Sequence, residues 1–223
     1  MPKSAAPNEI DGRPVKRVST RSKRDAIISN AIEIFSRDGY EDSKWADVAK
    51  AVGIGSTALY HYFESKVHCL YVILAEALEH HLDEFERVTK SADSFEQALD
   101  DALRAGFRLS GHEIARMRIL VSEQSLVAVA RKSEREESAR SLARERLRQL
   151  EFAWSTFLVR GMEQDVIPEA DPLMLSRALL GVNTSVWHWY RPGGAVQLSQ
   201  VEDFFVARQL AMVRVSSPPV DAA

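Results

Sequence analysis

The chain has 223 residues, of which 45% are hydrophobic, and its formal net charge is -3. This length exceeds one small domain and supplies enough apolar material for a sizeable core. The single cysteine, Cys69, excludes an intramolecular disulfide and a cysteine-cluster zinc site. No apolar run approaches the ~18 residues of a membrane-spanning helix, and the N-terminus has no signal-peptide core. We therefore expect a cytoplasmic protein without a membrane partner.

Basic residues are concentrated at the N-terminus, although the chain as a whole is acidic. Residues 1–24 carry a local charge of +5, so the remainder carries -8. A basic segment ahead of a groove-binding helix is typical of DNA-binding proteins, because it is attracted to phosphates and can enter the minor groove. We predict a flexible basic arm over residues 1–21. For the part before Val15, a disordered solubilising tail is an equally good interpretation.

Two helical patterns follow the arm. Residues 24–40 predict an amphipathic helix that ends at Gly39, where a left-handed conformation costs least. The apolar positions of residues 45–52 also recur at helical spacing, and Ser43 and Gly53 are the expected N-cap and C-cap of this second helix. The segment after Gly53 is therefore expected to begin a new helix.

The next helical pattern, residues 56–63, has two chemically different faces. One face carries Leu59, Tyr62 and Phe63 at the three-and-four spacing of a helix. The opposite face carries Ser56, Thr57, Tyr60 and His61. Hydroxyl, phenol and imidazole groups suit phosphate oxygens and base edges, and the second helix of a helix-turn-helix enters the major groove. The pattern predicts a DNA-reading helix, and the alternative is an ordinary helical hairpin with a solvated polar face.

The run from Ile28 to Leu70 resembles the N-terminal domain of TetR-family transcriptional repressors. The matching residues are Ala31, Phe35, Gly39, Tyr40, Val48, Ala49, Gly53, Leu59, Tyr60, Phe63, Lys66 and Leu70. The turn departs from the family, because Gly55 and Ser56 stand where relatives more usually carry a serine and a lysine. The exposed face and the resemblance together imply the DNA-binding residues Lys44, Ser56, Thr57, Tyr60, His61, Tyr62 and Lys66. We expect Tyr60, His61 and the two lysines to contact phosphates, and Ser56 and Thr57 to lie nearest the base edges.

The pattern stays helical from Lys66 to the end of the chain, and no segment shows sustained strand alternation. Serines that stand three residues before an acid or an amide predict helix starts. These serines are Ser22, Ser94, Ser110, Ser133 and Ser199. Asp171 with Pro172 predicts a further helix start, and that helix runs to about Tyr190.

These patterns predict an all-α fold with three parts after the arm. A three-helix helix-turn-helix DNA-binding domain is expected over residues 22–70 and a larger helical domain over residues 71–215. Residues 216–223 are expected to form a flexible tail. The TetR resemblance implies that the larger domain binds a small molecule and forms a dimer.

The predicted helix over residues 172–190 is apolar on more than one face, so it must be covered on several sides. Together with the final helix it resembles the pair that forms a four-helix bundle between two protomers in this family. The predicted interface residues are Val186, Trp187, Phe204 and Phe205. A homodimer with two-fold symmetry reads a palindromic operator. In the alternative interpretation, both helices belong to the core of a single chain.

The resemblance also implies a small-molecule pocket between the central helices. Its predicted walls are Phe107, Met117, Leu120, Phe152, Trp154, Phe157, Leu158, Leu180 and the polar Asn183. For each apolar residue taken alone, a place in the core is the better interpretation. The arginines that are candidates for contact with an anionic head group are Arg104, Arg108, Arg116, Arg118, Arg160 and Arg177. The segment Trp187–Gly194 resembles part of the regulators that sense lipid or acyl-thioester metabolites.

The sequence carries no enzyme signature. His80 stands four residues after Glu76, but the fuller spacing of a zinc-protease helix is missing, so a solvated polar face is the preferred interpretation. Cys69 has neither a glycine elbow nor a paired histidine and acid, which favours a buried small hydrophobe. We therefore expect no catalytic residue, no metal and no cofactor.

The sequence as a whole predicts a homodimeric, ligand-responsive regulator, most simply a repressor, that binds double-stranded DNA and is released by a small, largely apolar effector. One alternative is an enzyme with a vestigial DNA-binding head. Another is a helical protein-interaction module that binds a partner through its apolar C-terminal helices. Salt-dependent binding of duplex DNA separates the regulator from both alternatives, because neither predicts a phosphate-driven salt slope.

Overall fold

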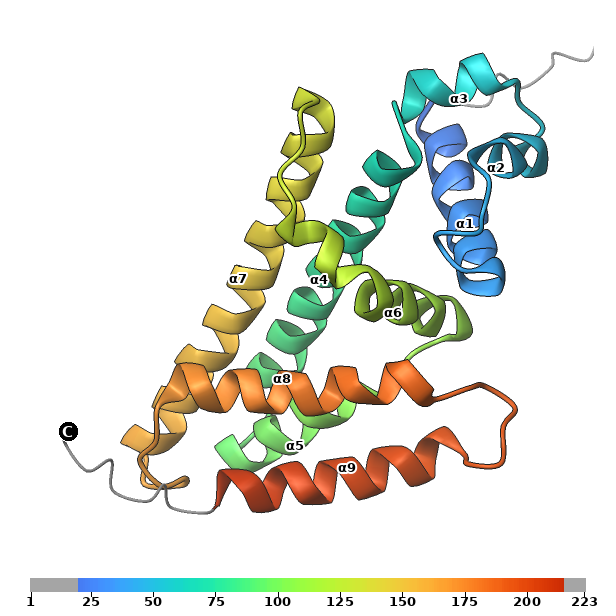
Figure 1. Cartoon of the computed structure of the whole chain (residues 1–223). Coiled ribbons are helices and arrows are strands. Elements are labelled where there is room, and N and C mark those ends of the chain that lie inside the picture. The colour runs from blue at the N-terminus through green and yellow to red at the C-terminus, as the bar shows by residue number, and fades with distance from the viewer. Residues whose placement is uncertain (1–19, 215–223) are drawn as a thin grey trace, which may run out of the picture.

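A computed structural model describes residues 20–214, and these residues form helices with no strand among them (Figure 1). The helices are α1 (Thr20–Asp38), α2 (Trp45–Val52), α3 (Ser56–Tyr62), α4 (Lys66–Ser91), α5 (Phe95–Ala105), α6 (Gly111–Glu123), the 3-10 helix η1 (Gln124–Ala128), α7 (Glu134–Glu163), α8 (Pro172–Trp189) and α9 (Leu198–Val213). The predicted all-α fold is confirmed. The predicted arm and tail lie outside the described residues, apart from Thr20 and Arg21 at the start of α1.

Side-chain caps begin four helices where the sequence predicts them. Ser94 and Ser133 cap α5 and α7 by accepting a hydrogen bond from the backbone N–H three residues later. Ser110 forms a reciprocal capping box with Glu113 at the start of α6. Asp171 caps α8 by accepting from two backbone N–H groups, each at 2.9 Å. These starts are fixed locally, because each cap satisfies N–H groups that have no partner within the helix.

Three of the predicted caps are wrong. The hydroxyl of Ser43 is buried and donates to the carbonyl of Tyr40 at 2.7 Å, so Lys44 becomes the N-cap of α2 without a side-chain hydrogen bond. Helix α1 begins two residues before Ser22, and α9 begins one residue before Ser199. At the start of α9 the side chain of Gln200 instead accepts a hydrogen bond from the backbone N–H of Gln197 at 3.0 Å.

The head, defined as residues 20–63, packs α1, α2 and α3 around one core. Large side chains buried in it include Ile27, Ile32, Phe35, Val48, Leu59 and Phe63. The first turns of α4 complete this core through Cys69 and Leu70. Because α4 has 26 residues, which is roughly 39 Å at 1.5 Å per residue, it extends from the head far into the rest of the molecule.

The body, defined as residues 66–214, has a second core that is built from α4 to α9. Helix α7 packs alongside α4, and α8 and α9 lie at the end of the molecule farthest from α3 (Figure 1). Helix α6 contacts α1, α4 and α8. The head is therefore joined to the body both by the continuous helix α4 and by the packing of α6 against α1.

Candidate DNA-binding and effector-binding sites

The turn between α2 and α3 places α3 on the outside of the head. Gly53 ends α2 with a φ of 71°, in the left-handed region that favours glycine, and its N–H donates to the carbonyl of Lys50 at 3.1 Å. The chain then reverses, and α3 begins at Ser56. Leu59 is fully buried and anchors α3 against α1 and α2. The turn and this anchor leave one face of α3 without protein cover.

That uncovered face of α3 carries four of the predicted DNA-binding residues. Ser56, Thr57, Tyr60 and His61 are all exposed, and Tyr60 keeps 51% of its accessible surface. Lys44 is also exposed at the N-cap of α2. Tyr62 differs from them, because its ring is partly buried against the head core. The structure thus brings together hydroxyl, phenol and imidazole groups at the tip of the head.

Lys66 has a different place from the one predicted. Its Nζ donates to the backbone carbonyls of Tyr40, Ser43 at 2.8 Å and Glu41 at 3.2 Å. The same ammonium lies 4.3 Å from the centroid of the Tyr40 ring. Burial lowers the pKa of Lys66. In this structure Lys66 ties the start of α4 to the loop between α1 and α2, and its contact with phosphate stays a prediction.

The N-terminus of α7 holds the junction between α3 and α4, a contact that sequence reasoning missed. Ser65 caps α4 and also donates to Glu136 at 2.6 Å. Arg135 donates to the carbonyl of Tyr62 at 3.2 Å, and the hydroxyl of Ser133 donates to Glu64. These pairs are 69 to 73 residues apart in the chain, so no local pattern signals them. They make the position of α3 depend on α7.

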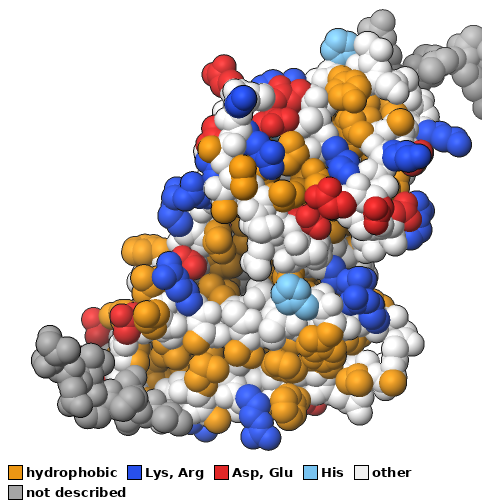
Figure 2. Space-filling view, viewed as in Figure 1, with side chains coloured by type: hydrophobic (Ala, Val, Ile, Leu, Met, Phe, Trp, Pro, Cys, Tyr) orange, Lys and Arg blue, Asp and Glu red, His pale blue; other side chains and the backbone are white. Residues whose placement is uncertain are grey.

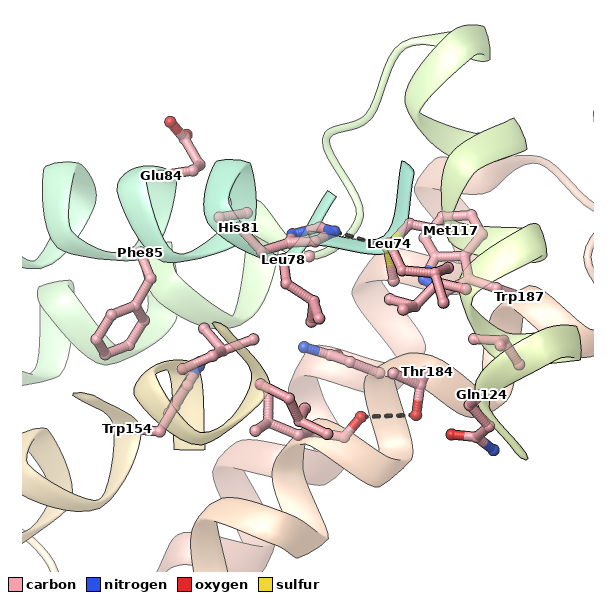
Figure 3. A pocket seen from close by; sticks show the side chains of 18 of the residues that line it. Leu74, Leu78, His81, Glu84, Phe85, Met117, Gln124, Trp154, Thr184 and Trp187 are labelled. Carbon is pink, nitrogen blue, oxygen red and sulfur yellow. Dashed lines mark hydrogen bonds between the residues drawn. The ribbon is translucent and has the colours of Figure 1, made fainter. Parts of the chain in front are cut away.

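A cavity of about 150 Å³ lies inside the body between α4, α5, α6, α7 and α8 (Figure 3). Most of its wall is apolar. Phe85 and Trp154 lie at one end of the view in Figure 3, and Met117 and Trp187 lie at the other. Such a largely apolar cavity with a few polar groups is typical of a small-molecule site.

The predicted pocket residues divide into two groups. Met117, Leu120, Trp154, Leu180 and Asn183 line the cavity. Phe107, Phe157 and Leu158 are buried but belong to the surrounding core, where Phe157 stacks on Phe95 with ring centroids 4.6 Å apart and Phe107 packs near Trp187. The prediction that Phe152 lines the pocket is wrong, because its side chain is 73% exposed on α7 and forms no part of the cavity wall.

The cavity wall carries no cationic side chain. The predicted arginines lie elsewhere, and Arg104 is held by Asp100 at 2.8 Å and by Glu202 at 3.1 Å, so that it joins α5 to α9. Glu84 is the one carboxylate of the wall, and it is paired with Arg87 on the same helix. The part of a ligand that fills this cavity is therefore expected to be uncharged, since an unpaired charge is costly in a dry apolar site.

Two buried polar groups at the cavity have no hydrogen-bond partner among the described residues. They are Oδ1 of Asn183 and Nε1 of Trp187. These residues are 8% and 1% exposed, and they lie four positions apart on one face of α8. Buried polar groups are usually satisfied, so each unsatisfied one needs an explanation such as a bound ligand. The sequence predicts Asn183 as a polar group of the pocket, whereas it places Trp187 in the dimer interface.

His81 also lines the cavity, and its Nε2 lies 2.7 Å from Sδ of Met117. Burial, with a smaller contribution from His80, lowers the pKa of His81 to about 4. The unfolded chain, with a pKa of about 6.5, takes up this proton more readily, so stability is fully present above pH 6.5 and falls as the pH drops toward 4.

We expect this histidine to remove about 2 kcal/mol from the free energy of unfolding between pH 7 and pH 5. Urea unfolding at both pH values tests this in the wild type and in His81→Phe, where that part of the pH dependence should disappear. His188→Phe is the matched control, because His188 is exposed. Equal pH dependence in all three proteins would contradict the assignment.

Only some of the predicted dimer-interface residues on α8 and α9 are exposed. Val186 and Trp187 are 0% and 1% exposed in a single chain, so a partner has no further surface of theirs to bury. Their predicted place in a dimer interface is therefore corrected to the intrachain core. Phe204 is 56% exposed, and Phe205 is half-buried against Phe107. Figure 2 shows hydrophobic side chains gathered over α8 and α9.

Cys69 is fully buried, and burial raises the pKa of its thiol. Within residues 20–214, no group of three or more His, Cys, Asp or Glu side chains is placed to hold a metal ion. None of the helices that the structure describes combines the length and apolar character needed to cross a membrane.

A three-helix head with a polar, exposed third helix defines a helix-turn-helix DNA-binding protein. Residues 27–71 match the family described as bacterial regulatory proteins, tetR family. Residues 108–213 match the tetracyclin repressor-like C-terminal domain. The chain belongs to the TetR family of transcriptional regulators, whose members are DNA-binding proteins and not enzymes.

The chain is also similar to a transcriptional repressor and to two solved structures. The chain is 24% identical over 187 residues to the HTH-type transcriptional repressor KstR2 of Mycolicibacterium smegmatis, covering 83% of this chain and 88% of that protein. The structure of the ketosteroid transcriptional regulator KstR2 of Mycobacterium tuberculosis superposes with a TM-score of 0.71 at 24% identity, over 89% of this chain and 98% of that one. AibR in complex with isovaleryl coenzyme A and operator DNA superposes with a TM-score of 0.68 at 18% identity, over 83% and 97%. At these identities the two structures show a shared fold.

Proposed function

We propose that this protein is a homodimeric repressor that binds a palindromic operator through α3 and is released from it by a small, largely apolar effector in the cavity of the body. The observation that carries the proposal is the pairing of an exposed polar face on α3 with a largely apolar cavity in the same chain. The membership in the TetR family supports the DNA-binding half, and the repressor KstR2 is a precedent for the direction of control.

Two helices provide a physical route from the cavity to the head. Helix α4 begins under the head and lines the cavity with Leu74 and Leu78. Helix α6 lines it with Met117 and Leu120 while it packs against α1. A ligand that fits the cavity better at one separation of the two heads shifts the dimer toward that state by its difference in affinity. The shift weakens binding to the operator if that separation of the heads does not match the spacing of the half-sites.

The effector is proposed to be a lipid or acyl-thioester metabolite. The protein is proposed to bind its operator in the cytoplasm. The cavity wall is largely apolar and its one carboxylate, Glu84, is paired with Arg87, so the wall fits the hydrocarbon part of such a molecule. AibR, which was solved with isovaleryl coenzyme A, is a precedent on the same fold. An enzyme with a vestigial head is disfavoured by the family membership, and a protein-interaction module leaves the exposed face of α3 without a role.

Selection of bound sequences from random duplexes tests the DNA-binding half. The wild type is expected to enrich an inverted repeat, because two α3 helices related by a two-fold axis read two half-sites. Thr57→Ala should change the preferred base at one position of each half-site. The free energy of binding that discriminates the preferred base should fall by about 1 to 3 kcal/mol. Enrichment of unrelated, asymmetric sequences would contradict the proposal.

Lys44→Ala is the matched comparison for Thr57→Ala. Lys44 is exposed beside α3, so its loss should weaken binding to all duplexes about equally. The salt slope of binding should fall by roughly two units, since a dimer loses two phosphate contacts. A titration of each duplex at several salt concentrations measures this. An unchanged slope with a new sequence preference would reverse the roles of the two residues.

A further inference from the structure

A second hollow, of about 340 Å³, lies where the head meets the body. Its walls come from the end of α1 and the following loop, from α6 and from the end of α8. We call it the junction groove, and the residues used below are Arg118, Glu123, Trp187 and Arg191. It therefore lies between the DNA-reading head and the helices that enclose the cavity.

The charges in the junction groove are not balanced. Arg37 and Asp38 pair with each other at 2.7 Å. Arg118 and Arg191 form no ion pair with any carboxylate among residues 20–214, and the remaining acid of the groove, Glu123, pairs with neither. Burial and the nearby charge of Arg191 lower the pKa of Arg118. An anion between these guanidinium groups would offset their repulsion.

Trp187 stands between the junction groove and the cavity, because it is a lining residue of both. It is 1% exposed, and its Nε1 has no hydrogen-bond partner among the described residues. An indole N–H is a donor only, so an acceptor oxygen is the group that would satisfy it. A ligand that extends from the cavity into the groove would pass this N–H.

We propose that the junction groove holds the anionic end of the effector, with Arg118 and Arg191 as its charged contacts and Trp187 as the donor to an oxygen between the two ends. This proposal rests on the proposed function, because it assigns the apolar end of the same molecule to the cavity. The chemical class is an apolar chain or ring that ends in a phosphate or carboxylate. Since the groove is walled by both head and body, an anion there contacts the two parts whose separation controls operator binding.

Three probes separate the two subsites in calorimetric titrations of the full chain. Octanol reports the cavity alone, pyrophosphate reports a free anion, and octyl phosphate reports both together. The wild type is expected to bind octyl phosphate roughly tenfold more tightly than octanol, with pyrophosphate the weakest of the three. The double variant Arg118→Gln with Arg191→Gln should bind octyl phosphate no better than octanol and should bind octanol as the wild type does.

The matched control is Arg144→Gln with Arg148→Gln, which removes two exposed arginines from α7 outside the groove. It should keep the tenfold preference. Glu123→Gln should increase the preference for octyl phosphate, because it removes the opposing charge of the groove. Trp187→Phe keeps an aromatic ring without the N–H and should lower the affinity for octyl phosphate several-fold.

Retention of the tenfold preference by the double groove variant would overturn the proposal. Binding of pyrophosphate as tightly as octyl phosphate would also overturn it, because the groove would then be a free-anion site independent of the cavity. Failure of octanol to bind would instead contradict the effector cavity of the proposed function. Operator binding, measured in parallel without a probe, reports whether each variant still folds and reads DNA.

Discussion

Phe204→Asp is expected to convert the proposed dimer into monomers and to weaken operator binding by about a hundredfold or more. Phe204 is the most exposed aromatic side chain of α9, at 56%. In the proposed dimer its ring is covered by the partner, so the introduced carboxylate would be desolvated without a counter-charge. A lone head also makes about half of the phosphate contacts, which removes much of the electrostatic part of binding.

Small residues are among the exposed positions of α8 and α9. On α8 the exposed positions include Ala178 and Gly181, and on α9 they include Ala207 and Ala211. Small residues allow two helices to approach closely, and the phenylalanine supplies apolar area at the edge of that contact. The choice of Phe204 over Phe205 follows from packing, because Phe205 is already half-buried within its own chain.

Light scattering beside a DNA titration checks this expectation. Leu142→Asp is the control, because Leu142 is an apolar residue of α7 that is 47% exposed and lies outside α8 and α9. The control should remain a dimer and bind the operator at wild-type strength. A Phe204→Asp protein that stays dimeric would refute the proposed interface, and a monomer with wild-type operator affinity would refute the link between the dimer and DNA reading.

The features that the sequence predicted well are those set by neighbouring residues. Ser94, Ser110 and Asp171 cap helices as expected, because a cap is formed by side-chain and backbone groups two or three positions apart. The exposed face of α3 was predictable for the same reason. Its periodicity requires the side of the helix opposite the buried Leu59 to face outward.

The features that were missed depend on partners distant in the chain. Ser43 fails as a cap because its hydroxyl is engaged by the carbonyl of Tyr40. Helix α8 is apolar on several faces, and periodicity does not reveal that Trp187 faces the cavity and groove while Ala178 faces outward. Phe152 shows the converse error, since an aromatic residue on a long helix was placed inside although it is exposed.

Lys66→Ala is expected to destabilise the head by about 2 to 4 kcal/mol and to weaken binding to every duplex without a change in sequence preference. The ammonium donates to the carbonyls of Tyr40, Ser43 and Glu41, which belong to the loop between α1 and α2. Removing it leaves partly buried carbonyls without their charged donor. The loop that sets the position of α2, and through α2 that of α3, then loses its tie to α4.

The salt dependence separates this role from the phosphate contact that the sequence suggested. If Lys66 acts by holding the loop, the affinity falls while the salt slope stays at the wild-type value, since no phosphate contact is lost directly. Urea unfolding and hydrogen exchange of the α2 amides should report the loss of stability. Lys44→Ala supplies the opposite pattern as a control, because the exposed Lys44 side chain makes no cap hydrogen bond at the start of α2. A Lys66→Ala protein with unchanged stability and a slope lower by roughly two units would restore the direct contact with DNA, and the observed hydrogen bonds would then describe only the protein without its operator.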